Sequence, residues 1–254
     1  MTTFVTAYLK VYDEEYDSSR NFDNRLKYFM LLLELGINIC IFIEPEFKSR
    51  FNKLEIKYKN LKIIQTLTIN DLEFYKIGEE HPELCFLPEK KNPAKDTKKY
   101  MFLMLSKLEF LKKSIDCNPY NSDYFCWFDF SLPYIFKDTN DTLLKIKKLA
   151  NSKFKDNVVY IPGCWNSKTN DLNYLSNNIV WRFCGGFLIG DKKSVLHFYM
   201  VSNDNFLSFL KQTRKLVWEV NYWAWLENAD LISPLWYLAD HNDTIVDVPY
   251  SLDT

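Results

Sequence analysis

The sequence predicts an α/β protein with a Rossmann-like, mixed but mostly parallel central sheet flanked by helices. Short apolar runs rich in aromatic and β-branched residues, typical of strands buried on both faces, alternate with amphipathic stretches. The first run starts at Phe4, almost at the first residue. The chain has 254 residues, 47% of them hydrophobic and 17% aromatic, which is enough for a large core. We expect one domain over residues 1–254.

The N-terminal part of the chain predicts repeating β-α units. Residues 4–11 and 38–44 are predicted strands, and between them lies a helix that should end at Gly36. Residues 61–67 predict a third strand after a charged helix. This repetition favours a parallel sheet with helices on both faces. Residues 78–96 are rich in Glu, Pro, Lys and Asn with little periodicity, and we expect a loop there.

The remaining elements are less regular after the middle of the chain. One helix from Asp96 or Thr97 to Ile115 should lead into a buried strand that ends at Asp129. The later predictions are helices over 141–149, 192–201, 205–216 and 218–228, strands over 157–162, 179–190 and 244–248, and a polar loop over 165–178.

Composition excludes several classes of protein. The formal net charge of −1 argues against a dedicated nucleic-acid binder. Six cysteines lie scattered without a CxxC or His-Cys cluster in the sequence, so we expect reduced thiols in an intracellular compartment. No apolar run approaches the roughly 18 residues that a membrane span needs, and no basic region opens the chain. We expect a soluble cytoplasmic protein.

The strand that ends in Asp129 is the first candidate site. An acid at the carboxyl end of a buried parallel strand stands where open α/β sheets bind ligands. The alternative is an Asp that caps the turn up to Pro133. Motifs for dinucleotide, P-loop, zinc-protease and serine-hydrolase sites do not occur, and three histidines are too few for a His-rich metal site.

Three further stretches carry polar residues in an apolar setting. A glycine pair, Gly185 and Gly186, interrupts an apolar run and indicates either a bulge or a close approach of a ligand. Glu219 and Asn221 stand among large aromatic residues, and His241 follows Asp240 near the end of the chain. Desolvation among aromatics would raise the pKa of a carboxyl such as Glu219, although a first-turn helix acid is an equal interpretation.

These motifs in this order resemble one family. The stretches FVTAY, WFDFS, CGGFLIG and WEVNYW, Lys107 on a helix and a late Asp-His pair are similar to the WlaTC/HtrL family, regarded as glycosyltransferases of the A-type (GT-A) nucleotide-sugar fold. The likeness spans roughly Phe4 to Val248, and only the combination of its short motifs is specific. The composition, rich in Lys and Asn and poor in Gly, also resembles that of proteins from large DNA viruses.

The resemblance implies a divalent cation, Mn²⁺ or Mg²⁺, that holds the donor diphosphate. In such transferases an Asp-x-Asp after a strand grips the cation. Asp129 matches the first acid, whereas Ser131 stands at the second position. Two outcomes are therefore open: Asp129 and the distant His241 hold the metal, or basic side chains hold the diphosphate without one.

The resemblance also assigns nucleotide-binding and catalytic positions. Thr6, Ala7 and Tyr8 would lie near the nucleotide, with the Tyr8 ring stacking on the base or simply half-buried. Lys107 would reach a phosphate, although a Lys on a helix is usually solvated. Glu219 would act as base on an acceptor hydroxyl. The remaining candidates for the nucleotide-sugar site are Asp129, Ser131, Gly185, Gly186 and Asn221, with Arg20 and Arg25 as further cations.

The expected function is hexosyl transfer from a nucleotide-diphosphate sugar, such as a UDP-sugar, to a glycan or protein hydroxyl. The alternative is a non-catalytic carbohydrate- or nucleotide-binding module on a degenerate transferase fold, which Ser131 would permit. A nucleotidyltransferase is a third reading, but it would normally need a glycine-rich phosphate loop near the first strand.

Overall fold

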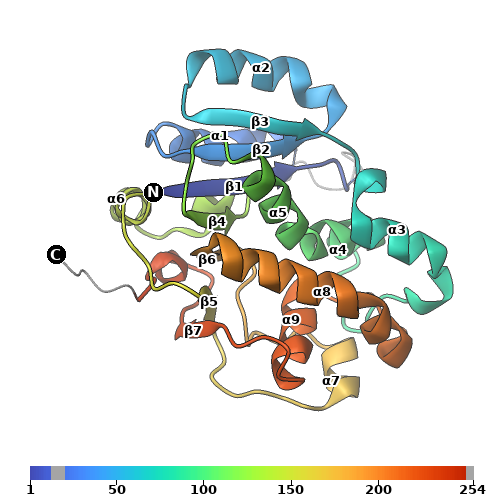
Figure 1. The fold of residues 1–254 in the computed structure, drawn as a ribbon. Helices are drawn as coiled ribbons and strands as arrows, with labels where there is room; N and C mark the ends of the chain where they lie inside the picture. Colours follow the sequence, from blue (N-terminus) through green and yellow to red (C-terminus); the bar gives the residue numbers. More distant parts are fainter. Residues whose placement is uncertain (13–20, 250–254) are drawn as a thin grey trace.

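The computed structural model describes residues 1–12 and 21–249, and the strands in these residues form one seven-stranded sheet (Figure 1). Their order is β3-β2-β1-β4-β6-β5-β7. Every neighbouring pair is parallel except the two pairs made by β6. The mixed, mostly parallel sheet that the sequence predicted is therefore confirmed. The strands are β1 (Thr2–Tyr8), β2 (Ile39–Ile43), β3 (Leu61–Thr66), β4 (Tyr124–Phe128), β5 (Val159–Gly163), β6 (Phe187–Asp191) and β7 (Leu235–Leu238).

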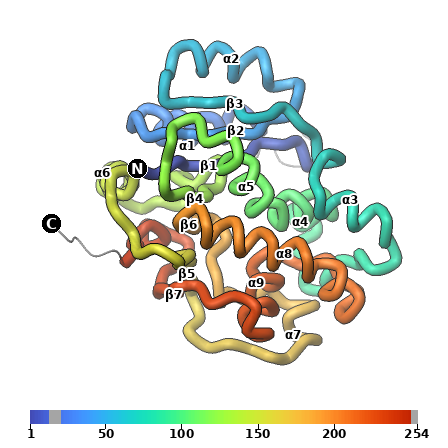
Figure 2. Tube along the Cα trace, viewed as in Figure 1, coloured from blue at the N-terminus to red at the C-terminus, as the bar shows by residue number. Residues whose placement is uncertain are grey.

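Helices cover both faces of the sheet (Figures 1 and 2). One apolar core joins the sheet to α3 (Glu73–Glu80), α4 (Lys98–Leu105), α5 (Lys107–Cys117), α7 (Leu172–Asn177), α8 (Lys192–Thr213) and α9 (Glu219–Asn228). The other joins it to α1 (Phe22–Leu33), α2 (Lys48–Lys57) and α6 (Thr139–Leu149). None of the helices in the described residues has the length and apolar character that crossing a bilayer requires.

The strands divide their side chains between these two cores by alternation. In β4, Phe125 and Trp127 belong to the core under α5 and α8, whereas Cys126 and Phe128 belong to the core under α1 and α6. All five β4 residues are buried, because helices cover both of its faces. This explains why the run appears in the sequence as continuous apolar residues without alternation.

Several predicted elements differ from the structure. The polar loop expected over 165–178 contains α7, and the loop expected over 78–96 contains the end of α3 and a 3-10 helix, Pro82–Leu84. The helix expected from 97 to 115 is broken at Ser106 into α4 and α5. The two helices expected over 192–216 are one helix, α8. The strand expected over 179–190 is confined to β6, so the glycine pair precedes the strand instead of interrupting it. Residues 244–248 form no strand; a short 3-10 helix, η6 (Asp243–Val246), stands there, and the last strand within the described residues is β7.

Two features of the topology determine where a ligand site forms. The chain builds β1, β2 and β3 outward on one side of β1 and then adds β4 on the other side, so the strand order reverses between β1 and β4. Open α/β sheets bind ligands at such a switch point, outside the carboxyl ends of the strands. Because β6 runs antiparallel, its amino-terminal start, with the glycine pair before it, lies at the same edge.

Asp191 connects the sheet to the longest helix. It ends β6 and caps α8, accepting hydrogen bonds from the backbone N–H groups of Lys193 and Ser194 at 2.9 and 3.1 Å. Burial acts to raise the pKa of Asp191, but hydrogen bonds from Ser194, Val158 and Asn157 outweigh it and lower that pKa. The ionised form of Asp191 therefore stabilises the folded state.

We expect Asp191→Ala to lower the free energy of unfolding by about 1–2 kcal/mol at pH 7, because the first turn of α8 loses its acceptor. The folded-state pKa lies below the unfolded value, so the contribution of Asp191 is complete above about pH 4 and is lost as the pH falls through the folded pKa. Urea unfolding across pH 3–7 should thus show the gap between wild type and variant narrowing in acid. Asp204→Ala, at an exposed position of the same helix, should leave stability nearly unchanged; equal losses in both variants would contradict the capping role.

Candidate functional site

A cleft of about 350 Å³ opens at the switch point between β1 and β4. Its volume lies within the range of small-molecule sites, about 300–1,000 Å³. The segments that follow β1 and β4 form two of its walls, and α1 and α4 contribute others. Aromatic rings dominate its lining, and they are Tyr8, Tyr12, Phe22, Tyr28, Phe47, Tyr100, Trp127, Phe130 and Tyr134.

Beneath this cleft lies a buried ammonium group, that of Lys107. Its side chain is 1% exposed. The Nζ atom donates to the backbone carbonyl of Gly185 at 2.8 Å and to Glu219 Oε1 at 2.7 Å, and it lies 3.0 Å from Asp129 Oδ1. Three acceptors match the three N–H bonds of an ammonium. Lys107 thus joins β4, the start of β6 and α9 at one point.

The break between α4 and α5 places Lys107 at the first position of a helix that enters the core. Ser106 adopts a non-helical backbone at this break, and its hydroxyl donates to the carbonyl of Phe102 at 2.9 Å. Such back-bonding bends helices. Burial alone would lower the pKa of Lys107, but the charges of Asp129 and Glu219 outweigh it and raise that pKa, so the group is charged.

Asp129 is the link between this buried cation and the cleft. Its Oδ1 accepts from the indole N–H of Trp127 at 2.9 Å as well as facing Lys107. Its backbone N–H donates to the carbonyl of Gly186 at 2.9 Å. Its side chain is nevertheless 40% exposed, and it is the only carboxylate among the described residues that line the cleft. The carboxylate is therefore both fixed in orientation and accessible to a ligand.

The two glycines have different surroundings. A Cβ at Gly185 would fall inside the van der Waals radius of Glu219 Oε1, so this glycine makes room for the buried ion pair. A Cβ at Gly186 would meet Ile245 at 3.4 Å and Asp129 Oδ2 at 3.5 Å, which are near-ordinary contacts. The donor-sugar role predicted for both glycines stays a prediction.

Three cationic side chains, those of Lys10, Arg25 and Lys95, also line the cleft. The Arg25 guanidinium donates to the Ser131 hydroxyl at 3.1 Å, which ties α1 to the segment after β4. Lys10 lies 3.9 Å from Glu46, and the Lys95 ammonium lies 5.1 Å from the centre of the Tyr100 ring. Three cationic side chains and one carboxylate give the cleft an excess of positive charge, which suits an anionic ligand.

Some of the predicted nucleotide-binding residues line the cleft, and others do not. Ala7, Tyr8, Asp129 and Ser131 line the cleft. The Tyr8 ring packs against Phe22, Phe47 and Phe130, with ring centres 4.8–5.1 Å apart. The remaining predicted residues of this site, Thr6, Lys107, Gly185 and Gly186, lie outside the cleft lining, and Arg20 falls outside the described residues.

The late-chain candidates lie away from the cleft lining. Glu219 is 6% exposed, and it contacts Lys107 without lining the cleft. Asn221 is fully buried, and its amide bonds the backbone of Leu175, Asn178 and Val180. It thus holds the segment between α7 and β6. The catalytic role of Glu219 and the ligand-binding role of Asn221 stay predictions.

His241 lies at the same edge of the sheet, after β7. Its ring packs edge-on against Trp181 with centres 4.1 Å apart, and its Nδ1 lies 3.7 Å from Cys164 Sγ. Burial lowers the pKa of His241, whereas the charges of Asp240 and Asp129 oppose that shift. The pairing of His241 with Asp129 around one metal stays a prediction.

The donors around Asp129 do not fit an Asp-x-Asp metal site. Hard divalent cations need oxygen ligands free to coordinate. Asp129 Oδ1 already faces an ammonium and an indole N–H, and the Ser131 hydroxyl accepts from Arg25. The Lys107 ammonium already supplies a positive charge beside Asp129, at the place where a metal ion would otherwise do so.

Sequence reasoning predicted neither side-chain partner of Asp129, Lys107 or Trp127. Residues two apart on a strand point to the same face, so the Trp127 indole and the Asp129 carboxylate could have been paired from their spacing. It also missed Tyr100 and Lys95 as cleft residues. Lys95 lies in the stretch expected to be an irregular loop, where no periodicity indicates which side chains face a site.

Comparisons with known proteins identify one matching family and solved structures with a similar fold. A family model described as "Bacterial protein of unknown function (HtrL_YibB)" matches residues 1–215, a span that ends before Glu219 and His241. No curated protein matches the sequence. The expected viral origin has no support in these comparisons.

Two solved structures are similar in fold. Mouse xyloside xylosyltransferase 1, in its apo form, is 8% identical with a TM-score of 0.48, covering 94% of this chain and 86% of that chain. A 4-diphosphocytidyl-2C-methyl-D-erythritol synthase from Anaerococcus prevotii DSM 20548 is 10% identical with a TM-score of 0.42, with the same coverages of 94% and 86%.

We expect Gly185→Ala to lower the free energy of unfolding by about 1–3 kcal/mol, because the new methyl group displaces Glu219 from Lys107. Gly186→Ala is the matched control, since its methyl group has room, and it should change stability by less than about 0.5 kcal/mol. Chemical denaturation of the two variants measures the difference. Equal stabilities would mean that the close approach at Gly185 is unimportant.

Proposed function

The chain belongs to the HtrL_YibB family, which is of unknown function, and we propose that it transfers a sugar from a nucleotide-diphosphate donor bound in the switch-point cleft. One observation carries the proposal: an accessible carboxylate, Asp129, stands fixed by Lys107 in a cleft lined by aromatic rings and cations. Each of these three components suits one part of such a donor. The resemblance of the short motifs to glycosyltransferases points the same way.

The diphosphate is the part that the cations recognise. Arg25 offers a planar group with several N–H donors for phosphate oxygens, and Lys10 and Lys95 add point charges. These side chains would stabilise the negative charge that builds up on the leaving diphosphate. This corresponds to the metal-free alternative among the sequence-based hypotheses.

The base and sugar are the parts that the aromatic lining accommodates. Tyr8, Tyr100 and Tyr134 present ring surfaces against which flat or partly apolar groups pack. Tyr134 is 71% exposed, so much of its ring is available to a ligand at the rim. Asp129 is suited to accept hydrogen bonds from sugar hydroxyls, because Lys107 and Trp127 hold only its Oδ1 in the described contacts.

In the transfer itself, the bond between the anomeric carbon and the diphosphate oxygen breaks, and its electron pair leaves with the nucleoside diphosphate. The acceptor oxygen bonds to that carbon and loses its proton. Asp129 is our candidate for that proton, since Glu219 does not line the cleft. Glu219 would instead act through Lys107, as a positioning residue for Asp129.

The test is to incubate the protein with UDP-, GDP- and TDP-sugars, with and without acceptor saccharides, and to measure nucleoside diphosphate release and binding. We expect release from at least one donor, insensitive to EDTA. Binding without release would favour the carbohydrate- or nucleotide-binding module. If the protein neither binds a donor nor releases nucleoside diphosphate, the proposal is excluded. EDTA-sensitive release would favour a metal held by Asp129 and His241.

Asp129→Asn should lower turnover by about 100-fold or more while the donor still binds within a few-fold, because an amide cannot accept the proton of the acceptor hydroxyl. Lys107→Met should lower turnover too and cost about 3–5 kcal/mol of stability, since two carboxylates lose their buried partner. Lys112→Met, at an exposed ion pair of the same helix, is the control and should leave both unchanged. Full turnover in Asp129→Asn would place the reacting group elsewhere.

A further inference from the structure

A second cluster of reactive side chains lies at the carboxyl edge of the sheet, apart from the cleft lining. Cys164 follows β5, Cys184 precedes β6, and His241 follows β7. One ligand atom from each of the three side chains lies within 4.8 Å of the others. Their spacing in the sequence gave no sign of a cluster, because the sheet topology brings the three segments together.

The distances between the donor atoms match those of a tetrahedral zinc site. Zn–S bonds of about 2.3 Å and Zn–N bonds of about 2.0 Å place two sulfurs about 3.8 Å apart and a sulfur and a nitrogen about 3.5 Å apart. Cys164 Sγ lies 3.4 Å from Cys184 Sγ and 3.7 Å from His241 Nδ1. Asp240 Oδ1 lies 3.7 Å from both Cys164 Sγ and His241 Nδ1. It lies outside the group of three whose ligand atoms are all within 4.8 Å of one another, so its side chain would turn toward Cys184 to become the fourth ligand.

Backbone contacts hold the cysteines in this arrangement. The N–H of Cys164 donates to the carbonyl of Trp181 at 2.9 Å, and the N–H of Cys184 donates to the carbonyl of Pro162 at 2.7 Å. The N–H of Ala239 donates to the carbonyl of Gly163 at 2.9 Å, which fixes the segment before Asp240. The donors are thus presented by a rigid sheet edge.

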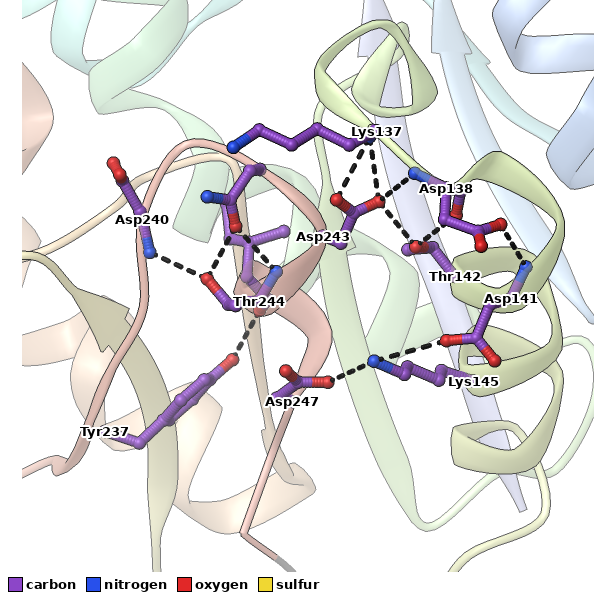
Figure 3. A network of polar contacts seen from close by, with 12 residues as sticks. Lys137, Asp138, Asp141, Thr142, Lys145, Tyr237, Asp240, Asp243, Thr244 and Asp247 are labelled. Carbon is purple, nitrogen blue, oxygen red and sulfur yellow. Dashed lines mark hydrogen bonds and ion pairs between the residues drawn. The ribbon is translucent and has the colours of Figure 1, made fainter.

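The loop that carries Asp240 and His241 is fixed from its other side (Figure 3). The Thr244 hydroxyl accepts from the N–H of Asp240 at 2.9 Å. Asp243 accepts from the backbone of Lys137 at 2.9 Å and from the Thr142 hydroxyl at 2.7 Å, which ties the loop to α6. Because these bonds already order the loop, binding a metal there costs less conformational entropy.

We propose that Cys164, Cys184 and His241, with Asp240 as fourth ligand, bind a Zn²⁺ ion that holds the ends of β5 and β7 and the start of β6 together. Two sulfurs and an imidazole are the soft and intermediate ligands that zinc prefers, unlike the oxygen ligands of Mg²⁺. Four protein ligands leave no open position, which is typical of a structural site.

A disulfide between the cysteines explains fewer of the observations. It would account for the approach of the two sulfurs, but it gives no reason for His241 Nδ1 and the Asp240 carboxylate to converge on Cys164. Access also fits a metal: Cys184 is fully buried, whereas His241 is 41% exposed and Asp240 is 71% exposed. An ion can enter from the solvent side.

The test is to titrate the reduced, metal-free full chain with Co²⁺ and to follow absorption. We expect one equivalent, with sulfur-to-cobalt charge-transfer bands, displaced by Zn²⁺. Cys164→Ser and His241→Gln should each weaken binding at least about tenfold, whereas Cys117→Ser, an exposed cysteine elsewhere, should leave it unchanged. Absence of sulfur-to-cobalt bands, or unchanged affinity in Cys164→Ser, would overturn the proposal.

A second measurement on the unmodified chain does not depend on a variant that folds. Bound Zn²⁺ should slow alkylation of Cys164 by at least about tenfold without affecting Cys117, as read by mass spectrometry of peptides. Equal rates with and without Zn²⁺, or a Cys164–Cys184 disulfide in protein purified with the metal present, would overturn the proposal. Neither readout depends on sugar transfer, so the zinc site and the proposed function stand or fall separately.

Discussion

A charged ammonium group in the middle of the molecule requires partners on every side, and the arrangement around Lys107 follows from this. A buried cation is tolerated only when it is paired and hydrogen-bonded. Here the acceptors come from the end of β4, from the backbone before β6 and from the first turn of α9. Gly185 lacks a side chain because Glu219 occupies that space, and Asp129 is held in one orientation at the floor of the cleft.

The sequence predicted the fold well where burial determines the residue pattern. Strands buried on both faces appear as unbroken apolar runs, and the bounds of β2 and β3 and the end of β4 were predicted to within one residue. The first strand was expected over 4–11, but β1 begins two residues earlier and ends three residues earlier. The prediction failed where polar residues sit inside an element: helices were expected over 192–201 and 205–216, but α8 continues through the residues between them, where Asp204 is exposed to solvent. The short edge strand β7 was missed, since Ile245 and Val246 nearby carry a stronger strand pattern but fill the core from a 3-10 turn.

The acidic residue of the candidate site, Asp129, could be predicted from the sequence, but the contacts between distant residues of the site could not. Asp129 could be singled out because a charge directly after a buried strand is unusual, whereas Tyr8 was assigned only through the family resemblance. Two of the three partners of Lys107 lie 78 and 112 residues further along the chain, so no local pattern reveals that this helix lysine is buried. The same holds for the convergence of Cys164, Cys184 and His241, which depends on strand order alone.

The single reversed strand also has a consequence for how the chain is made. β6 lies between β4 and β5 in the sheet, although β5 is synthesised first. A growing chain that ends before Phe187 can assemble β1 to β4, but β5 has no edge to join, and the outer edge of β4 stays without its neighbour. An unpaired apolar edge is the surface on which strands of other chains add. Synthesis of β6 therefore supplies the strand that covers the outer edge of β4 and joins β5 to the sheet.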